Sequence, residues 1–320
     1  MIANFNKQPI KEIHGKEKLV YIFDEKKGAN IDGAVVTSFG EEWLKFNNFK
    51  EKDINQFGDE YFDIADAAIL NKNAYVLDMG CGSGRFSWYL SSRVGFIEAM
   101  DPSEAIWAAE KLLCGINNVR MINASADSIP FNNNTFDLVI SIGVLHHIPD
   151  TQMAMKNCIS KLKQGGHFFV YLYYNLENRG FAFRLLFKVV SLTRKIISSM
   201  PSSLKKFMCD LLAVFIYVPI IFVGKALYYI GLKKMANKLP LSYYQDKSFF
   251  IIRNDALDRF GTRLEHRFSK AQIQDMMESC GLTNIRFSTN KPYWHAIGKR
   301  YDFTIKITFF MYFFKVHKYN

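Results

Sequence analysis

The feature that most restricts the fold of this chain is a glycine-rich stretch, VLDMGCGSGRF, from Val76 to Phe86. An apolar run leads into it, glycines stand at positions 80, 82 and 84, and FSWYLSSR follows with a helix-like pattern. Ligands in open α/β sheets bind at the carboxyl ends of the strands. Glycine accepts a positive φ and lets a ligand approach the backbone, and the first N–H groups of a helix favour an anion. The stretch therefore predicts a strand, a ligand-binding turn and a helix.

The sequence around this turn alternates between short apolar runs and helix-like or loop segments. The runs are AYVLDMG, FIEAMD, VRMINAS, FDLVISIG and HFFVYLYY, between Ala74 and Tyr174. This alternation is typical of a parallel sheet with helical crossovers, and it predicts an α/β, Rossmann-like core. The 320 residues exceed one domain of roughly 100–200 residues, so we expect substantial additions to that core.

Carboxylates follow the second and third apolar runs, near the predicted glycine turn. Asp101 ends FIEAMD, where a carboxylate could accept both hydroxyls of a ribose. Asp127 follows the third run, where it could accept an adenine amino group. A dinucleotide fingerprint GxGxxG is excluded, because Arg85 occupies the position of its third glycine.

Four stretches, in order and spacing, resemble the successive motifs of class I S-adenosylmethionine-dependent methyltransferases with a UbiE-like, type 11 core. They are VLDMGCGSGRF, EAMDPSEA, NASADSIPFNNNTFDLVISIGVLHHIPD and LKQGGHFFVYLYY, and they cover about residues 74–174. The resemblance implies S-adenosyl-L-methionine as the cofactor and a mostly parallel, seven-stranded sheet with a reversed last hairpin. It implies cofactor contacts from the following residues: Asp78, Gly80 and Gly82 at the methionine and ribose, Asp101 at the ribose hydroxyls, Ala126 and Asp127 at adenine, Ile142 and Gly143 at the methionine end, and Cys81, Gly84 and Pro102 beside them.

The dipeptide His146-His147 in GVLHHIPD supplies the candidate catalytic residues. Imidazole titrates near neutral pH, so either histidine could act as a general base, or the pair could only shape the site. Methyl transfer from a sulfonium is an in-line displacement in which the protein mainly aligns the reacting groups. An acceptor hydroxyl would have to lose its proton, whereas an acceptor carboxylate would not.

Residues 1–73 are expected to form a helical lid or cap over the core. In TSFGEEWLKF, Phe39, Trp43 and Phe46 recur at spacings of four and three on one helical face. An ordinary core helix would show the same pattern. The resemblance favours a lid, so Phe39 and Trp43 are candidate cofactor-binding residues.

Residues 181–240 form a predicted helical insertion before the last strands, and it is basic and apolar at once. Ten Lys and Arg stand between Arg184 and Lys238 against one acid, Asp210. The apolar window from Leu211 to Gly224 is short of the roughly 20 residues that a simple membrane-spanning helix needs. We expect either helices that lie in the interface of an anionic membrane or a cap with solvated lysines. Single-strand binding would need aromatics presented among the charges as stacking platforms, whereas Leu, Ile, Val and Phe predominate here in long runs, which argues against nucleic acid.

Residues 241–320 are expected to contain a substrate-facing segment and the final strands. The stretch from Ser242 to Phe268 mixes hydrogen-bonding groups with aromatics, which suits a polar, glycan-like substrate or a salt-bridged connector. Together with PYW at 292–294, it resembles a poorly characterised group of bacterial methyltransferases with a long C-terminal half. SKAQIQDMMESCGL predicts an N-capped helix, and FSTNKPYWHAIGKR a late strand.

The remaining features locate the protein and limit its chemistry. The five cysteines show no paired or metal-ligand spacing, which predicts reduced thiols and no metal site. The first residues lack the apolar core of a signal peptide. We therefore expect a cytoplasmic enzyme, peripheral to the inner face of the membrane, that methylates a small molecule, glycan or lipid-linked acceptor, most simply on oxygen. A non-catalytic cofactor-binding module and methylation of nucleic acid or protein are the alternatives.

Overall fold

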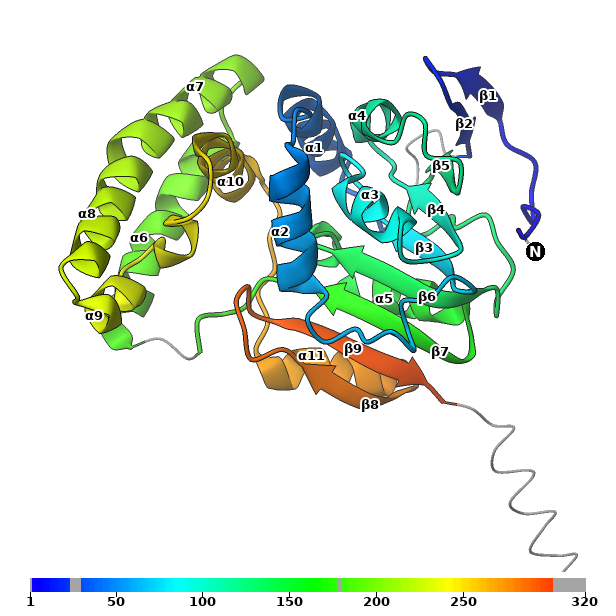
Figure 1. Cartoon of the computed structure of the whole chain (residues 1–320). Coiled ribbons are helices and arrows are strands. Elements are labelled where there is room, and N and C mark those ends of the chain that lie inside the picture. Colours follow the sequence, from blue (N-terminus) through cyan, green and yellow to red (C-terminus); the bar gives the residue numbers. More distant parts are fainter. Residues whose placement is uncertain (1, 24–29, 178–179, 302–320) are drawn as a thin grey trace, which may run out of the picture.

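The computed structural model describes residues 2–23, 30–177 and 180–301, and these form one sheet with helices on both faces (Figure 1). The strands of this sheet lie in the order β1-β2-β5-β4-β3-β6-β7-β9-β8. Their bounds are Lys11–His14 (β1), Leu19–Ile22 (β2), Tyr75–Met79 (β3), Phe96–Met100 (β4), Val119–Asn123 (β5), Phe136–Ile142 (β6), Leu162–Tyr171 (β7), Leu282–Phe287 (β8) and His295–Arg300 (β9). All five apolar runs of the sequence are strands, so the predicted α/β core is confirmed.

The inner strands run parallel, and β9 is antiparallel to both of its neighbours, β7 and β8. The predicted reversal near the C-terminus is therefore present. The predicted number of seven strands is wrong for the described residues, because β1 and β2 extend the sheet beyond β5. Residues 1–73 are accordingly not purely helical. The pairing of β2 with β5 gives hydrogen-bond partners to a strand edge that would otherwise be exposed.

Two helical layers cover the sheet. Packing on one face involves α1 (Gly33–Lys45), α2 (Glu51–Tyr61), α3 (Arg85–Ser91) and α4 (Ala105–Leu112), and on the other face α5 (Thr151–Ser160) and α11 (Lys270–Ser279). Strand β3 shows how alternation feeds both layers, because Val76 packs toward the first and Leu77 toward the second. The predicted N-cap of α11 is confirmed, with a capping box between Ser269 and Gln272.

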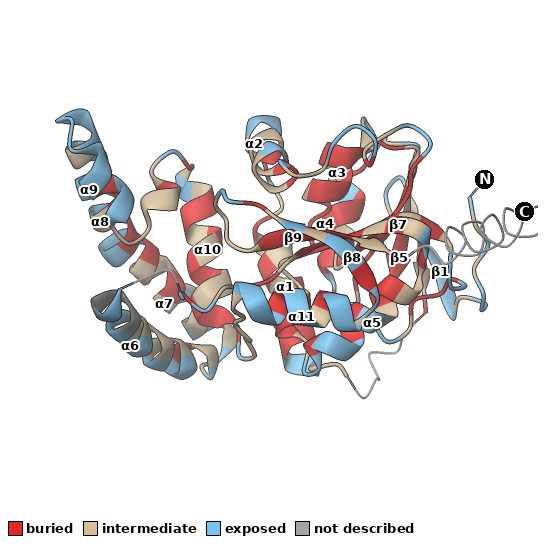
Figure 2. Cartoon of the chain, turned by 90° about the horizontal axis from the view of Figure 1, so that it is seen from below, coloured by how far each residue is buried: buried red, intermediate tan, exposed pale blue. Residues whose placement is uncertain are grey.

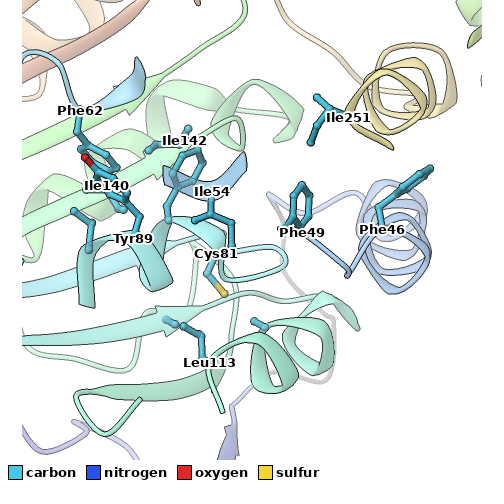
Figure 3. Packing of buried hydrophobic residues seen from close by; sticks show 14 of the residues in the cluster. Phe46, Phe49, Ile54, Phe62, Cys81, Tyr89, Leu113, Ile140, Ile142 and Ile251 are labelled. Carbon is cyan, nitrogen blue, oxygen red and sulfur yellow. The ribbon is translucent and has the colours of Figure 1, made fainter. Parts of the chain in front are cut away.

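The first layer continues without interruption into the helices that lie beyond the sheet. Figure 3 shows Ile140 and Ile142 of β6 in the same packed cluster as Phe46, Phe49 and Ile251, which lies on α10 (Phe249–Gly261). The additions to the fold therefore share the hydrophobic core of the sheet domain.

The predicted insertion is helical. It contains α6 (Phe181–Ser198), α7 (Ser202–Leu212), a π-helical turn η2 (Ala213–Tyr217), α8 (Val218–Tyr229), α9 (Lys233–Lys238) and a 3-10 turn η3 (Ser242–Tyr244). Elements α7, η2 and α8 form one continuous helix from Ser202 to Tyr229, the one helix among the described residues that is long and apolar enough to cross a membrane. The premise that the apolar segment is too short is therefore wrong. Pro219 falls in the first turn of α8, directly after the wide π turn, and does not end the helix.

Polar contacts fasten this long helix to the rest of the fold. Asp210 on α7 binds Lys45 of α1 at 3.2 Å and Arg253 of α10 at 2.7 Å. Beside it, the buried Glu42 of α1 accepts a hydrogen bond from Asn254 of α10. The inner side of the insertion is thus held as a cap, as one of the two alternatives supposed.

Candidate functional site

The glycine turn between β3 and α3 has the bare, left-handed backbone that its sequence predicts. Gly80 has φ +78° and Gly82 has φ +54°. A Cβ at Gly80 would lie 2.4 Å from the Val144 side chain, and one at Gly82 would lie 3.1 Å from Trp43 Nε1. Both positions therefore require glycine, for backbone conformation and for space.

Asp101 stands at the end of β4, directly beside this turn. Its Oδ2 accepts a hydrogen bond from the Gly82 backbone at 2.9 Å, and its Oδ1 accepts two from the backbone and hydroxyl of Ser103. Burial raises the pKa of Asp101, while these hydrogen bonds act in the opposite direction. The carboxylate is thus fixed in position.

A cavity of about 440 Å³ opens over the turn and extends to the helical insertion. Eleven of the predicted site residues line it: Phe39, Trp43, Gly80, Cys81, Gly82, Asp101, Pro102, Ala126, Ile142, Gly143 and His147. This volume is in the range of small-molecule and cofactor sites, roughly 300–1,000 Å³. The strand ends and α1 therefore enclose one site.

Helix α1 forms the cover over the glycine end of the cavity. The Arg85 guanidinium lies 4.7 Å from the ring of Trp43, and Phe39 lies 4.8 Å from the ring of His147. Phe46, the third residue of the predicted stripe, is instead buried beside Phe250 of α10. Phe39 and Trp43 thus line the cavity, as expected of a lid, whereas Phe46 packs in the core, as expected of an ordinary core helix.

Beside the α1 cover, where Phe39 meets His147, the cavity carries a group of ionisable and hydroxyl side chains. Tyr173, just beyond β7, donates a hydrogen bond from its hydroxyl to Oδ2 of Asp258 on α10. Oδ1 of Asp258 lies 4.0 Å from Nε2 of His147, and neither atom has a hydrogen-bond partner among the described residues. Nδ1 of His147 lies 2.7 Å from the Leu264 carbonyl oxygen and must donate to it, so Nε2 keeps its lone pair in the neutral ring.

The surroundings set the protonation of these groups. Burial, followed by the repulsion of Asp255 and Glu265, raises the pKa of Asp258 to about 7, against the hydrogen bond from Tyr173. Burial lowers the pKa of His147 to about 4. At neutral pH the histidine is therefore uncharged, and Asp258 keeps its proton to a higher pH than an ordinary carboxyl.

Four predicted site residues do not line the cavity. Asp78 is buried under the turn, where it accepts a hydrogen bond from the Ser87 hydroxyl at 2.7 Å, and burial raises its pKa to about 7. Gly84 is the N-cap of α3 and packs against Ala109.

The other two of the four are polar residues of later loops. Asp127 is exposed and accepts a hydrogen bond from the Asn30 backbone at 3.0 Å. His146 is fully buried behind Tyr173, with ring centroids 3.9 Å apart, and burial lowers its pKa far below the usual range. This places His146 as a support for Tyr173.

Three of the cavity residues that sequence reasoning missed bear directly on the chemistry of the site, namely Tyr173, Asp258 and Ser83. Tyr173 was part of a predicted strand, and Asp258 was one polar residue among many in the stretch from Ser242 to Phe268. Ser83 lies inside the glycine turn, and its buried hydroxyl has no partner among the described residues. The sequence carried a signal for Tyr173 and Ser83, because both follow strand ends. It carried none for Asp258, because no local pattern shows that α10 packs against the end of β7.

The described residues contain no group of His, Cys, Asp or Glu side chains that could hold a metal ion. Cys81 is the cysteine that lines the cavity, and burial raises the pKa of its thiol well above the usual range. The thiol form of Cys81 is therefore favoured over the reactive thiolate.

Comparison with known proteins gives a family for the central part of the chain. Residues 77–170 match the methyltransferase domain family. An uncharacterised methyltransferase of Bacillus subtilis, YcgJ, is 32% identical over 109 residues, which are 32% of this chain and 42% of the relative. A ubiquinone biosynthesis O-methyltransferase of Marinobacter nauticus is 29% identical over 152 residues, 44% of this chain and 62% of the relative. The chain thus spans about half the length of the curated relatives it matches.

Two solved structures that align with this chain are a methyltransferase-related protein of Bacillus subtilis and a methyltransferase of Synechocystis. The crystal structure of Bacillus subtilis YcgJ aligns with a TM-score of 0.44 and 16% identity, over 74% of this chain and 70% of that one. Magnesium protoporphyrin IX methyltransferase of Synechocystis, solved with bound SAH, aligns with a TM-score of 0.45 and 16% identity, over 81% and 93%.

Proposed function

Because residues 77–170 form a class I methyltransferase domain, we propose that this chain is an S-adenosylmethionine-dependent methyltransferase. The observation that carries the proposal is the single cavity in which the left-handed glycine turn, the fixed Asp101 carboxylate and the α1 cover meet. Each of these features was expected from a different part of the sequence.

The residues present fit the cofactor. A side chain at Gly80 or Gly82 would fill the space over the turn, and the Ser83 hydroxyl is a buried polar group in need of a partner. The Asp101 carboxylate would receive the ribose hydroxyls, and Ala126 with the neighbouring Ser125 would face the adenine. Trp43 and Phe39 of α1 would close the methionine and ribose side.

When bound, S-adenosylmethionine supplies a methyl group on a sulfonium, which is ready for in-line displacement. The task of the chain is to align an acceptor and take up its proton. A general base works best when its pKa lies near the working pH. Asp258, with a pKa of about 7, meets this condition better than His147, with a pKa of about 4. We therefore assign the general base to Asp258, held by Tyr173.

This assignment favours a hydroxyl acceptor and hence an O-methyltransferase. The Asp258 carboxylate would take up the proton that the acceptor hydroxyl loses. The acceptor end offers further polar groups from α10, Asn254 and Asp255, next to apolar groups from the insertion. A small molecule with a polar head, such as a glycan or lipid-linked group, suits such a wall.

Transfer of a tritiated methyl group from the cofactor into extracts of the source cells tests the proposal. The extracts are separated into aqueous and lipid fractions, and wild-type protein is compared with Asp258→Asn. We expect label in one fraction with the wild type and a large loss with the variant. If the protein binds the cofactor but neither fraction contains labelled product, the proposed enzymatic activity is contradicted and a non-catalytic cofactor-binding module is the better description.

A further inference from the structure

The outer side of the helical insertion exposes a large apolar surface among the described residues. On α6, the exposed residues Phe181, Leu185, Val189, Leu192 and Ile196 recur at spacings of four and three, which is one helical stripe. The long helix from Ser202 to Tyr229 adds a second set: Leu204, Phe207, Val214, Phe215, Ile216, Val218, Phe222, Val223, Tyr228 and Tyr229. We call these two sets the outer apolar face. Figure 2 shows exposed residues along α6, α8 and α9. Monomeric soluble proteins rarely show contiguous apolar patches larger than a few hundred Å².

Unpaired positive charges accompany this face. Lys188, Lys195, Lys225, Lys233 and Lys234 are all exposed, and no described acid pairs with them. The acid of the insertion, Asp210, is already neutralised by Lys45 and Arg253. An apolar surface with free lysines is complementary to an anionic bilayer, where apolar side chains enter the acyl boundary and lysines meet the headgroups.

We propose that the outer apolar face lies in the interfacial plane of an anionic lipid bilayer. The long helix does not span that bilayer. Its inner stripe, which includes Cys209, Ala213 and Tyr217, is buried in the core, and Tyr217 donates a hydrogen bond to Asp255 of α10 at 3.0 Å. A spanning position would carry this stripe and the Asp210 ion pairs into lipid, and that loss outweighs the gain from the outer side chains.

The site described above opens toward this face. Leu186 of α6 and Ile216 of η2 line the cavity, and they are 48% and 49% exposed. Helix α6 packs on α10 and α7, whereas α8 packs mainly on α9 and the turns beside it, so α6 and α8 diverge (Figure 2). This inference rests on the proposed methyl transfer. The acceptor is an amphiphile whose polar head reaches Asp258, and its apolar chain leaves the cavity between α6 and η2 toward the bilayer.

Flotation of the full chain with vesicles tests the docking. Vesicles in which about one-third of the lipid is anionic phosphatidylglycerol and the rest is phosphatidylcholine are compared with vesicles of phosphatidylcholine alone. The variant Phe181→Ser/Phe215→Ser/Phe222→Ser changes the outer apolar face, and a matched control replaces Ile10, Ile13 and Met153 by Ser, since these apolar residues are exposed outside the insertion. We expect anionic vesicles to bind the wild type and the control, and to bind the face variant at least tenfold more weakly.

The charge contribution is measured in the same assay. Changing Lys188, Lys225, Lys233 and Lys234 to Gln should lower binding by about 600-fold, since each basic residue near the surface contributes about fivefold. Titration with S-adenosylhomocysteine must give the same affinity for every variant, which separates this proposal from the cofactor site. Three results would each overturn the bilayer assignment. The control variant alone could lose vesicle binding, or the wild-type protein could fail to bind vesicles at all. The wild type could also be a dimer that dissociates when the outer apolar face is changed.

A fluorescent amphiphile with a twelve-carbon chain, 12-(NBD-amino)dodecanoic acid, tests the opening without vesicles. We expect its emission to rise with the wild type, and Leu186→Trp/Ile216→Trp to weaken binding at least tenfold while cofactor affinity stays unchanged. Equal binding by both proteins would overturn the amphiphilic acceptor and leave the docking face standing.

Discussion

Among single residues, the proposed chemistry depends most on Asp258. Its side chain is 25% exposed, yet Oδ1 is shielded from solvent and has no partner among the described residues. The carboxylate is held by Tyr173, which in turn stacks on the buried His146. A buried carboxyl with a raised pKa, held in place by neighbouring side chains such as Tyr173 and His146, is typical of a functional site.

Replacing Asp258 by Asn should lower the rate of methyl transfer by about 10²–10⁴, the usual contribution of a general base. The wild-type rate should rise with pH through about 7, because the base must be ionised, and this rise should vanish in the variant. The exposed Asp246 on the preceding loop provides a matched control, Asp246→Asn, which should retain rate and profile. An unchanged profile in Asp258→Asn would overturn the assignment of the general base to Asp258.

The same substitution should stabilise the folded protein. The pKa of Asp258 is raised in the folded state, so the folded protein holds this proton more tightly than the unfolded chain, and stability declines as pH rises from about 4 to about 7. Asn cannot ionise. Denaturant unfolding at pH 8 should show a gain of about 1–3 kcal/mol for the variant, shrinking toward zero at pH 4. A loss of stability at pH 8 would contradict the electrostatic account.

Among the elements, the glycine turn and the long helix differ in how far their sequences define them. The turn is defined locally, since Gly80 and Gly82 fit only a left-handed backbone with no side chain. The long helix is not, because Pro219 suggests a break that the preceding π turn accommodates. Local pattern therefore predicted the turn and failed at the length of the helix.

A comparison of two glycines separates backbone strain from crowding in the turn. Gly80 and Gly115 have nearly the same φ, +78° and +74°, but a Cβ at Gly115 meets nothing within 4 Å. Gly115→Ala should cost about 1 kcal/mol of stability, the price of a left-handed alanine. Gly80→Ala should cost clearly more, because it must also displace Val144, and should weaken cofactor binding. Equal losses of stability in thermal unfolding would show that crowding at Gly80 is unimportant.

At the scale of the whole molecule, the sheet was predictable and its surroundings were less so. The apolar runs predicted the strands, and the residues that follow them lie at one edge of the sheet because parallel strands align their carboxyl ends. The antiparallel direction of β9 was predicted from the family resemblance and not from the residues. The strands β1 and β2 were missed because short, exposed strands such as KEIH carry little apolar signal. The contact between Asp258 and the end of β7 depends on tertiary packing, which no local pattern contains.

The central claim is that the glycine turn and Asp101 bind the cofactor, and calorimetric titration with S-adenosylhomocysteine tests it most directly. The account predicts saturable one-to-one binding by the wild type. In Asp101→Ala, binding should weaken by about ten- to a hundredfold, because the ribose hydroxyls lose a charged acceptor. No binding by the wild type, or equal affinity in the folded variant, would contradict the account.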